Sequence, residues 1–241
     1  MNKLVLIAIA AVAAIAVVTA AFSIGLFGKE ESPYEPVIDP ADFVLQVDNP
    51  YFPLVPGTTF VYEGVSEDGN ERNEMTVTND TKKVMNVTCV VIHDRVWLEG
   101  DLIEETFDWY AQDKDGNVWY FGEDSREISN GAVVSTEGSW EAGVDGAQPG
   151  IVMPADPTVG QEYRQEYYKG EAEDMAEVLA LNESVTVPYG TFDSCLVTKD
   201  WTPLEKGIAE NKYYQHGVGL VKELQVEGGT GYMELVDILT G

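Results

Sequence analysis

Three observations predict an all-β fold, an antiparallel meander that forms a curved sheet or an open barrel behind an N-terminal signal or transmembrane helix. Short runs of alternating apolar and polar residues recur at even spacing, with turn residues between them. Two aromatic-rich runs flank a polar Asp-Lys-Asp-Gly-Asn tip within residues 107–124. The Asn130-Gly131 pair is the strongest short-range signal for a hairpin.

The N-terminal segment predicts export. After Lys3, residues 4–27 form a run of about twenty-four residues without a charge, which is long enough to cross a hydrocarbon core. We expect residues 1–28 to be a signal peptide or a membrane anchor; the length favours an anchor, whereas Val18-Thr19-Ala20 offers a signal peptidase small residues. The protein is expected to be extracytoplasmic, anchored by residues 4–27 or secreted after cleavage.

Residues 29–40 are polar and rich in proline, which is typical of a short linker. The extracytoplasmic β domain is then expected over residues 41–241. Residues 41–57 carry too many prolines for an inner strand and too many large apolar side chains for a linker. We expect this segment to pack across the mouth of the sheet.

The strands are expected in chain order after this segment. The first group comprises residues 58–64, 73–79, 83–94, 102–112, 117–122, 126–129 and 132–136. Residues 138–160 then form a long loop whose apolar side chains are typical of a lid or cap. The second group comprises residues 161–168, 184–187, 191–199, 212–215, 219–226 and 232–239, with one short helix expected over residues 171–180.

Aligning the chain with itself at an offset of about 106 residues reveals a weak internal repeat. Thr88-Cys89 matches Ser194-Cys195, and the register holds without a gap for about twenty residues. In the same register Asp94 meets Asp200 and Glu104 meets Glu210. The repeat has two explanations. Either the chain consists of two duplicated halves, or the match arises because β strands use a small set of residue types.

The formal net charge of −28 limits the possible partners. Nucleic acid and anionic membrane surfaces would repel the domain, and the chain has no Lys/Arg cluster that could displace their counterions. We therefore expect contact with the membrane only through the N-terminal helix. The acidic composition suits a surface protein, a salt-rich medium or cation binding equally well.

The chain has two cysteines, Cys89 and Cys195. Outside the cell a disulfide between them is the expected state, and it would close a loop of roughly a hundred residues worth on the order of 4–5 kcal/mol. The alternative is two buried thiols that act as small apolar side chains.

A resemblance emerges in the C-terminal part. The motifs Val-Pro-Tyr-Gly-Thr-Phe at 187–192, Tyr213-Tyr214 and Gly-Val-Gly-Leu-Val at 217–221 resemble a pattern of uncharacterised exported β proteins, whose curved sheet is similar to that of the LolA/LolB-like lipoprotein carriers. The resemblance covers about sixty residues at most. It implies a concave face that can hold an acyl chain. The run Tyr213 to His216 departs from an apolar continuation, so no ligand is transferred.

Weak candidate sites come from single residues and short motifs. Large side chains that could line a ligand site are Trp109, Trp119, Trp140, Met153, Tyr163 and Tyr213. Asp113, Asp115 and Asn117 resemble the start of a calcium loop, but the closing glutamate is missing, so a hairpin tip is favoured and no cofactor is expected. Acceptor patterns for N-glycosylation begin at Asn79, Asn86 and Asn182.

Two classes of function fit these features. The first is a non-enzymatic, surface-tethered or secreted β module that binds an envelope component or a small apolar ligand. The alternative is a carboxylate-based hydrolase that acts beneath residues 138–160 and uses Glu141, Asp145 and Arg164. No nucleophile paired with a base is visible in the sequence, so we favour the binding module.

Overall fold

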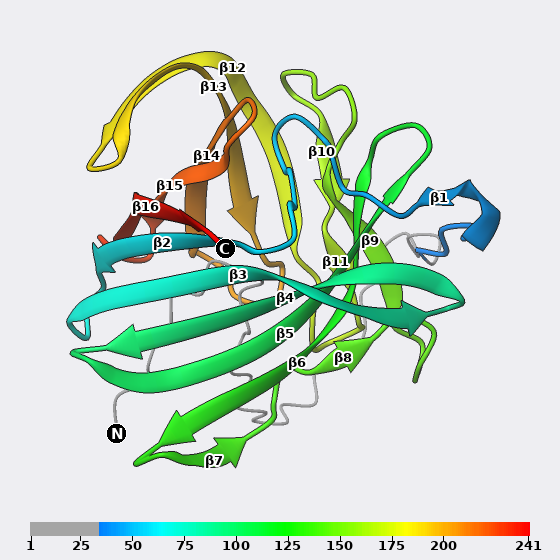
Figure 1. The fold of residues 1–241 in the computed structure, drawn as a ribbon, viewed down its shortest axis with the longest axis horizontal. Helices are drawn as coiled ribbons and strands as arrows, with labels where there is room; N and C mark the ends of the chain where they lie inside the picture. Colours follow the sequence, from blue (N-terminus) through cyan, green and yellow to red (C-terminus); the bar gives the residue numbers. More distant parts are fainter. Residues whose placement is uncertain (1–33) are drawn as a thin grey trace, which may run out of the picture.

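The computed structural model describes residues 34–241 and confirms the all-β, antiparallel fold. Sixteen strands form one strongly curved sheet (Figure 1), and the only helix in this part of the chain is one 3-10 turn, η1 (Pro40–Asp42). The predicted signal or anchor lies outside the described residues. No helix within residues 34–241 has the length and hydropathy required to span a bilayer.

The first half of the sheet is a meander of long strands. Its elements are β1 (Phe43–Val44), β2 (Thr58–Val65), β3 (Asn70–Val84), β4 (Val87–Leu98), β5 (Asp101–Asp113), β6 (Val118–Ser129), β7 (Ala132–Ser135), β8 (Trp140–Glu141) and β9 (Gln148–Met153). Strands β2 to β6 pair in chain order, and β9 then pairs with β6. The Asn130-Gly131 hairpin is confirmed between β6 and β7, with positive φ at both residues.

The second half returns to the first. Its strands are β10 (Glu162–Arg164), β11 (Glu166–Tyr167), β12 (Met175–Val187), β13 (Gly190–Trp201), β14 (Ala209–Gln215), β15 (Gly219–Glu227) and β16 (Tyr232–Thr240). β16 pairs with β2, which joins the two halves. The two ends of the sheet are β10 and β11, which are separated in the chain by Gln165 alone, so the sheet nearly closes into a barrel.

Three of the expected elements were wrong. Residues 138–160 were expected as one long loop, but they contain β8 and β9, which both pair with β6. Residues 83–94 were expected as one strand, but Met85 and Asn86 adopt positive φ and form the turn between β3 and β4. Residues 171–180 were expected as a helix and instead enter β12, where Ala176 and Val178 are buried. Pairing with β13 buries these alternate side chains, and that gain outweighs the local helix propensity.

The segment between β1 and β2 crosses the open end of the sheet, as expected from its prolines, and runs between the two halves in Figure 1. It is fastened at several points. Gly217 N donates to Pro50 O at 2.7 Å, and the Tyr51 ring packs edge-on against His216. Asn49 Nδ2 donates to Gly116 O and Pro154 O. The segment is therefore a fixed cover that is tied to hairpins of both halves.

The internal repeat aligns β4 and β5 with β13 and β14. Each pair is antiparallel and is preceded by a long partner strand, β3 or β12. The registers differ by two residues: Asp94 pairs with Thr106 in the first half, whereas Asp200 pairs with Glu210 in the second. A shift of two residues keeps each side chain on its own face, because side chains alternate with a period of two.

The structure corrects the predicted disulfide, since Cys89 and Cys195 are free and buried. Cys89 lies on β4 and Cys195 on β13, and five strands separate these two in the sheet order. The Cys89 side chain is fully buried, and burial raises the pKa of its thiol to about 12. Both residues therefore act as small apolar side chains, which was the alternative reading.

We expect two titratable thiols per chain when the protein is unfolded in denaturant without a reductant. We also expect the melting temperature to be the same with and without dithiothreitol, because no cross-link constrains the unfolded chain. A thiol-reagent count and a thermal scan check these results. A count of zero together with a lower melting temperature on reduction would contradict the free thiols.

Candidate functional site

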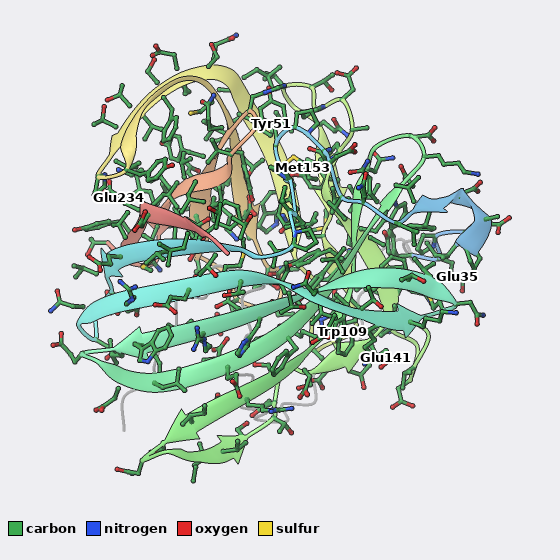
Figure 2. All side chains as sticks on the ribbon, in the orientation of Figure 1. Glu35, Tyr51, Trp109, Glu141, Met153 and Glu234 are labelled. Carbon is green, nitrogen blue, oxygen red and sulfur yellow. The ribbon has the colours of Figure 1, made fainter. Side chains whose placement is uncertain are left out.

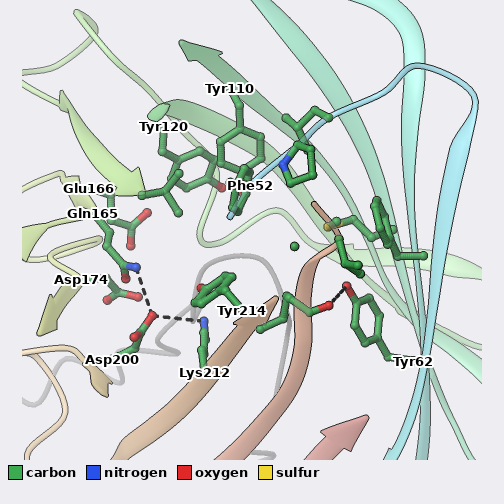
Figure 3. Close-up of a pocket in the computed structure, with 18 of the residues that line it drawn as sticks. Phe52, Tyr62, Tyr110, Tyr120, Gln165, Glu166, Asp174, Asp200, Lys212 and Tyr214 are labelled. Carbon is green, nitrogen blue, oxygen red and sulfur yellow. Dashed lines mark hydrogen bonds and ion pairs between the residues drawn. The ribbon is translucent and has the colours of Figure 1, made fainter. Parts of the chain in front are cut away.

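A cavity of about 60 Å³ lies between the two halves of the sheet, beneath residues 52–54 of the cover. This space holds roughly four to six water-sized groups. Its wall has two chemically distinct parts (Figure 3). One part carries aromatic and aliphatic side chains, and the other carries Gln165, Glu166, Asp174, Asp200 and Lys212.

The aromatic part is built from strands of both halves. Tyr110 on β5 and Tyr120 on β6 are cross-strand partners whose rings stack at 4.7 Å between centroids. Phe52 of the cover packs on Tyr110 at 5.3 Å. Tyr214 on β14 lines the same space from the second half. Aromatic walls of this kind present an apolar surface together with negatively polarised ring faces.

The polar part continues along the strands away from the cavity. On β5, Asp108, Thr106 and Glu104 share the face of Tyr110, because they lie two, four and six residues before it. On β14, Lys212 and Glu210 share the face of Tyr214 in the same way. The interior of the sheet is therefore aromatic near the cover and acidic farther in.

The interior of the sheet buries many more acidic side chains than basic ones. Ten carboxyl side chains are buried, namely Glu71, Asp94, Glu104, Asp108, Glu123, Glu166, Asp174, Asp200, Glu210 and Glu223. Lys212 is the only buried lysine or arginine within residues 34–241. Its Nζ lies 3.6 Å from Asp200 Oδ2 and 3.8 Å from Glu223 Oε2. A single ammonium group thus faces a large excess of buried acids.

Burial shifts the protonation equilibrium of most of these acids toward the neutral form. Burial raises the pKa of Glu104, Asp108 and Asp174 to about 7 in each case. Burial, and then the charge of Asp174, raises the pKa of Glu166 well above its ordinary value. Burial lowers the pKa of Lys212, but the charges of Glu223 and Asp200 offset this effect and raise it. Lys212 therefore stays charged.

Several buried oxygen atoms have no hydrogen-bond partner within residues 34–241. They include Glu71 Oε2, Asp94 Oδ2, Asp108 Oδ2 and both carboxyl oxygens of Glu223. A buried ionised carboxylate without partners would be costly, whereas a protonated carboxyl carries a smaller penalty. The unpaired atoms agree with the raised pKa values.

The six large side chains proposed from the sequence do not line the cavity. Trp109 lies on the opposite face of β5, where Lys82 Nζ sits 3.2 Å from its ring centroid and pairs with Glu141 at 2.7 Å (Figure 2). Met153 is fully buried in the core, and Tyr163 is buried on β10. The sequence analysis missed the cavity residues that directly follow three of these six: Tyr110 follows Trp109, Tyr120 follows Trp119, and Tyr214 follows Tyr213.

Trp119 and Trp140 have structural partners. Trp119 Nε1 donates to Asp113 Oδ2 at 2.8 Å, and Trp140 Nε1 donates to Glu166 Oε2 at 3.1 Å. Trp140 thus supports an acid of the cavity wall from behind. Tyr213 is partly buried on β14 and packs against the core on the face opposite Tyr214.

The Asp113-Lys-Asp115-Gly-Asn117 segment is a hairpin tip. Asp113 Oδ1 accepts from Asn117 N at 2.9 Å, and Asp113 Oδ2 accepts from Asn117 Nδ2 at 2.8 Å. This carboxylate is therefore occupied within its own turn. Among the described residues no group of three or more His, Cys, Asp or Glu side chains is arranged to hold a metal ion.

The residues proposed for a hydrolase are not assembled at the cavity. Glu141 pairs with Lys82, and Asp145 lies in an exposed turn with φ of 51°. The Arg164 guanidinium lies over the rings of Tyr34 and Tyr167. The three glycosylation candidates, Asn79, Asn86 and Asn182, are all exposed, and their modification stays a prediction.

Replacing Lys212 with methionine tests the charge balance of the interior. We expect Lys212→Met to lower the free energy of unfolding by about 3–5 kcal/mol at pH 7.5, because it leaves buried acids without their cation. Lys199→Met is the matched control: Lys199 pairs with Glu227 at 2.6 Å, but this pair is at the surface and should cost about 1 kcal/mol or less. Urea unfolding measures both, and equal losses would contradict the argument.

The raised pKa values predict a pH dependence of stability. Because the folded state binds protons more tightly than the unfolded state, the free energy of unfolding should fall as pH rises from about 4 to about 7. Asp108→Asn should raise stability at pH 8 by on the order of a few kcal/mol and change it little at pH 4. The amide still accepts the Tyr120 hydroxyl, which donates to Asp108 at 2.7 Å in the native protein.

The control for this prediction is Glu137→Gln at an exposed position, which removes the same charge. Thermal scans from pH 4 to pH 8 compare the two variants. If Asp108→Asn and Glu137→Gln shift the melting temperature equally at pH 8, the effect is general charge repulsion, and a raised pKa at Asp108 is ruled out.

Comparison with known proteins gives likenesses of fold. No protein-family model matches the chain, and no curated protein matches it. Among solved structures, a proposed exported protein of Bacteroides fragilis with a YmcC-like fold is 18% identical, with a TM-score of 0.48 over 79% of this chain and 99% of that one. A proposed lipoprotein of Parabacteroides distasonis is 15% identical, with a TM-score of 0.43 over 78% and 98% of the two chains. The function is therefore argued from the cavity.

Proposed function

We propose that the protein is a non-enzymatic, extracytoplasmic β module that binds a small ligand with an apolar body in the cavity of its sheet. The observation that carries this proposal is the aromatic wall of Phe52, Tyr110, Tyr120 and Tyr214 beneath a fixed cover. Concave sites with mostly apolar walls and a few convergent polar groups are the usual places for small ligands. The apolar run at residues 4–27 supports a location outside the cytoplasm.

The composition of the cavity favours binding over catalysis. Its wall contains no serine, threonine, cysteine or histidine from the described part of the chain. A nucleophile activated by an adjacent base is the usual mark of covalent catalysis. A carboxylate pair could still act as acid and base, but Glu141 of the alternative hydrolase proposal is already paired with Lys82.

A series of linear alcohols from butanol to octanol tests whether the cavity accepts an apolar body. Affinity should rise by about 0.8 kcal/mol, or roughly fourfold, for each methylene group that is buried. The rise should stop once the chain fills the cavity. Isothermal titration calorimetry gives the affinities, and thermal shifts provide a second readout.

The variant Met75→Trp should abolish this binding, because Met75 lines the cavity and the indole would fill it. Leu239→Trp at an exposed position is the control and should bind the alcohols normally. Circular dichroism verifies that both variants fold, since added volume in a core typically costs about 1–3 kcal/mol. If no alcohol binds the native protein, or if Met75→Trp binds them as well as the native protein does, the proposal is wrong.

A further inference from the structure

The acidic part of the cavity wall has more carboxyl groups than cationic groups: Glu166, Asp174 and Asp200 stand beside Lys212 alone. Glu166 and Asp174 are 1% and 7% exposed, and their carboxyl groups point into the cavity in Figure 3. Glu166 enters from β11, and Asp174 immediately precedes β12. They approach the same space from two neighbouring segments of the chain.

Lys212 lies closest to two other acids. Its ammonium group lies within 4 Å of Asp200 and Glu223, and Asp200 also accepts hydrogen bonds from Gln165 Nε2 at 3.0 Å and Thr198 Oγ1 at 2.5 Å. Within residues 34–241, no lysine, arginine or histidine forms an ion pair with Glu166 or Asp174. The cavity wall thus carries three carboxyl groups, of Glu166, Asp174 and Asp200, and one ammonium group, which lies within 4 Å of Asp200 but of neither Glu166 nor Asp174.

The opposite wall consists of aromatic rings. Cations are attracted to the faces of such rings, and the attraction strengthens when water is excluded. The described part of the chain already contains this arrangement: on the other face of β5, the Lys82 ammonium lies on the Trp109 ring and pairs with Glu141. The cavity offers the same two kinds of partner, aromatic rings and carboxyl groups, and its one side-chain cation, Lys212, is paired with Asp200 and Glu223.

We propose that the ligand of the cavity is a small organic cation, an ammonium group with short apolar substituents. This inference rests on the proposed function and adds the charge of the ligand to it. The positive centre lies between the carboxyl groups of Glu166 and Asp174 and the rings of Tyr120 and Tyr214, and its alkyl groups contact Phe52 and Tyr110. A cation of this size fits the roughly four to six water-sized groups that the cavity holds.

The experiment compares three probes of nearly the same shape and different charge. Choline is the cation, 3,3-dimethyl-1-butanol is its neutral carbon isostere, and 3,3-dimethylbutanoate is an anion of similar bulk. Calorimetry at physiological ionic strength and pH 8 gives the three affinities. We expect choline to bind at least tenfold more tightly than the alcohol, and the anion to bind more weakly than both.

Two variants locate the effect. Glu166→Gln and Asp174→Asn should each weaken choline binding at least tenfold and leave binding of the neutral alcohol within about twofold, because each removes a charge and keeps the shape of the wall. Glu162→Gln on β10 is the control, since Glu162 is exposed and its loss changes the net charge equally. If one variant fails to fold, the other and the probe comparison on the native protein still decide.

The outcomes separate this inference from the proposed function. If the neutral isostere binds as tightly as choline, the inference fails while the apolar site stands. If choline binds but Glu162→Gln weakens it as much as Glu166→Gln and Asp174→Asn do, the attraction comes from the net charge of the protein, and the inference also fails. If neither these probes nor the linear alcohols bind, both the inference and the proposed function fail.

Discussion

The burial of many carboxyl groups around one lysine is the constraint on which the rest of the interior depends. An ordinary sheet of this size would fill its concave side with apolar side chains, but here β4, β5, β13 and β14 each bury at least one acid. They are tolerated because burial raises the pKa of eight of the ten acids, and the neutral form that this favours avoids the cost of a buried charge. Lys212 balances the acids nearest to it, and the cover of residues 45–57 closes the end where aromatic rings replace acids. The cavity forms at the boundary between these two chemistries.

Much of the fold could be predicted from the sequence, because strands and hairpins leave local signals. The alternation of residues, the Asn130-Gly131 turn and the prolines of the cover each depend on neighbouring residues alone. The errors arose where the local signal was ambiguous. Met85-Asn86 carries no glycine, so the turn between β3 and β4 was hidden, although asparagine tolerates positive φ better than most residues. The segment that enters β12 favours a helix locally, and only its pairing with β13 makes it a strand.

The site was harder to predict than the fold, because a shift of one residue along a strand reverses the face. Trp109, Trp119 and Tyr213 were proposed as ligand residues on account of their size, but Tyr110, Tyr120 and Tyr214 beside them face the cavity. In a run of consecutive aromatic residues, the sequence does not indicate whether the odd-numbered or the even-numbered side chains point inward. β-Bulges shift this parity further, as between Tyr120 and Glu123 of β6, where three steps along β6 match two steps along β5. The face of each side chain is set by the closure of the sheet, which is a long-range property.

One signal for the interior was present in the sequence. The repeat aligned Asp94 with Asp200 and Glu104 with Glu210, and all four are buried on the inner face. An acid that recurs at equivalent strand positions is a better indicator of an inward carboxyl than any single acid in a chain with 42 of them. The same alignment matches Thr106 of the first half with Lys212 of the second half. The two halves therefore differ at the one aligned position that carries a buried cation. The first half therefore has no cation at the position where the second has an ammonium group, and Glu166 and Asp174, which lie outside the repeat, add two more carboxyl groups to the cavity between the halves.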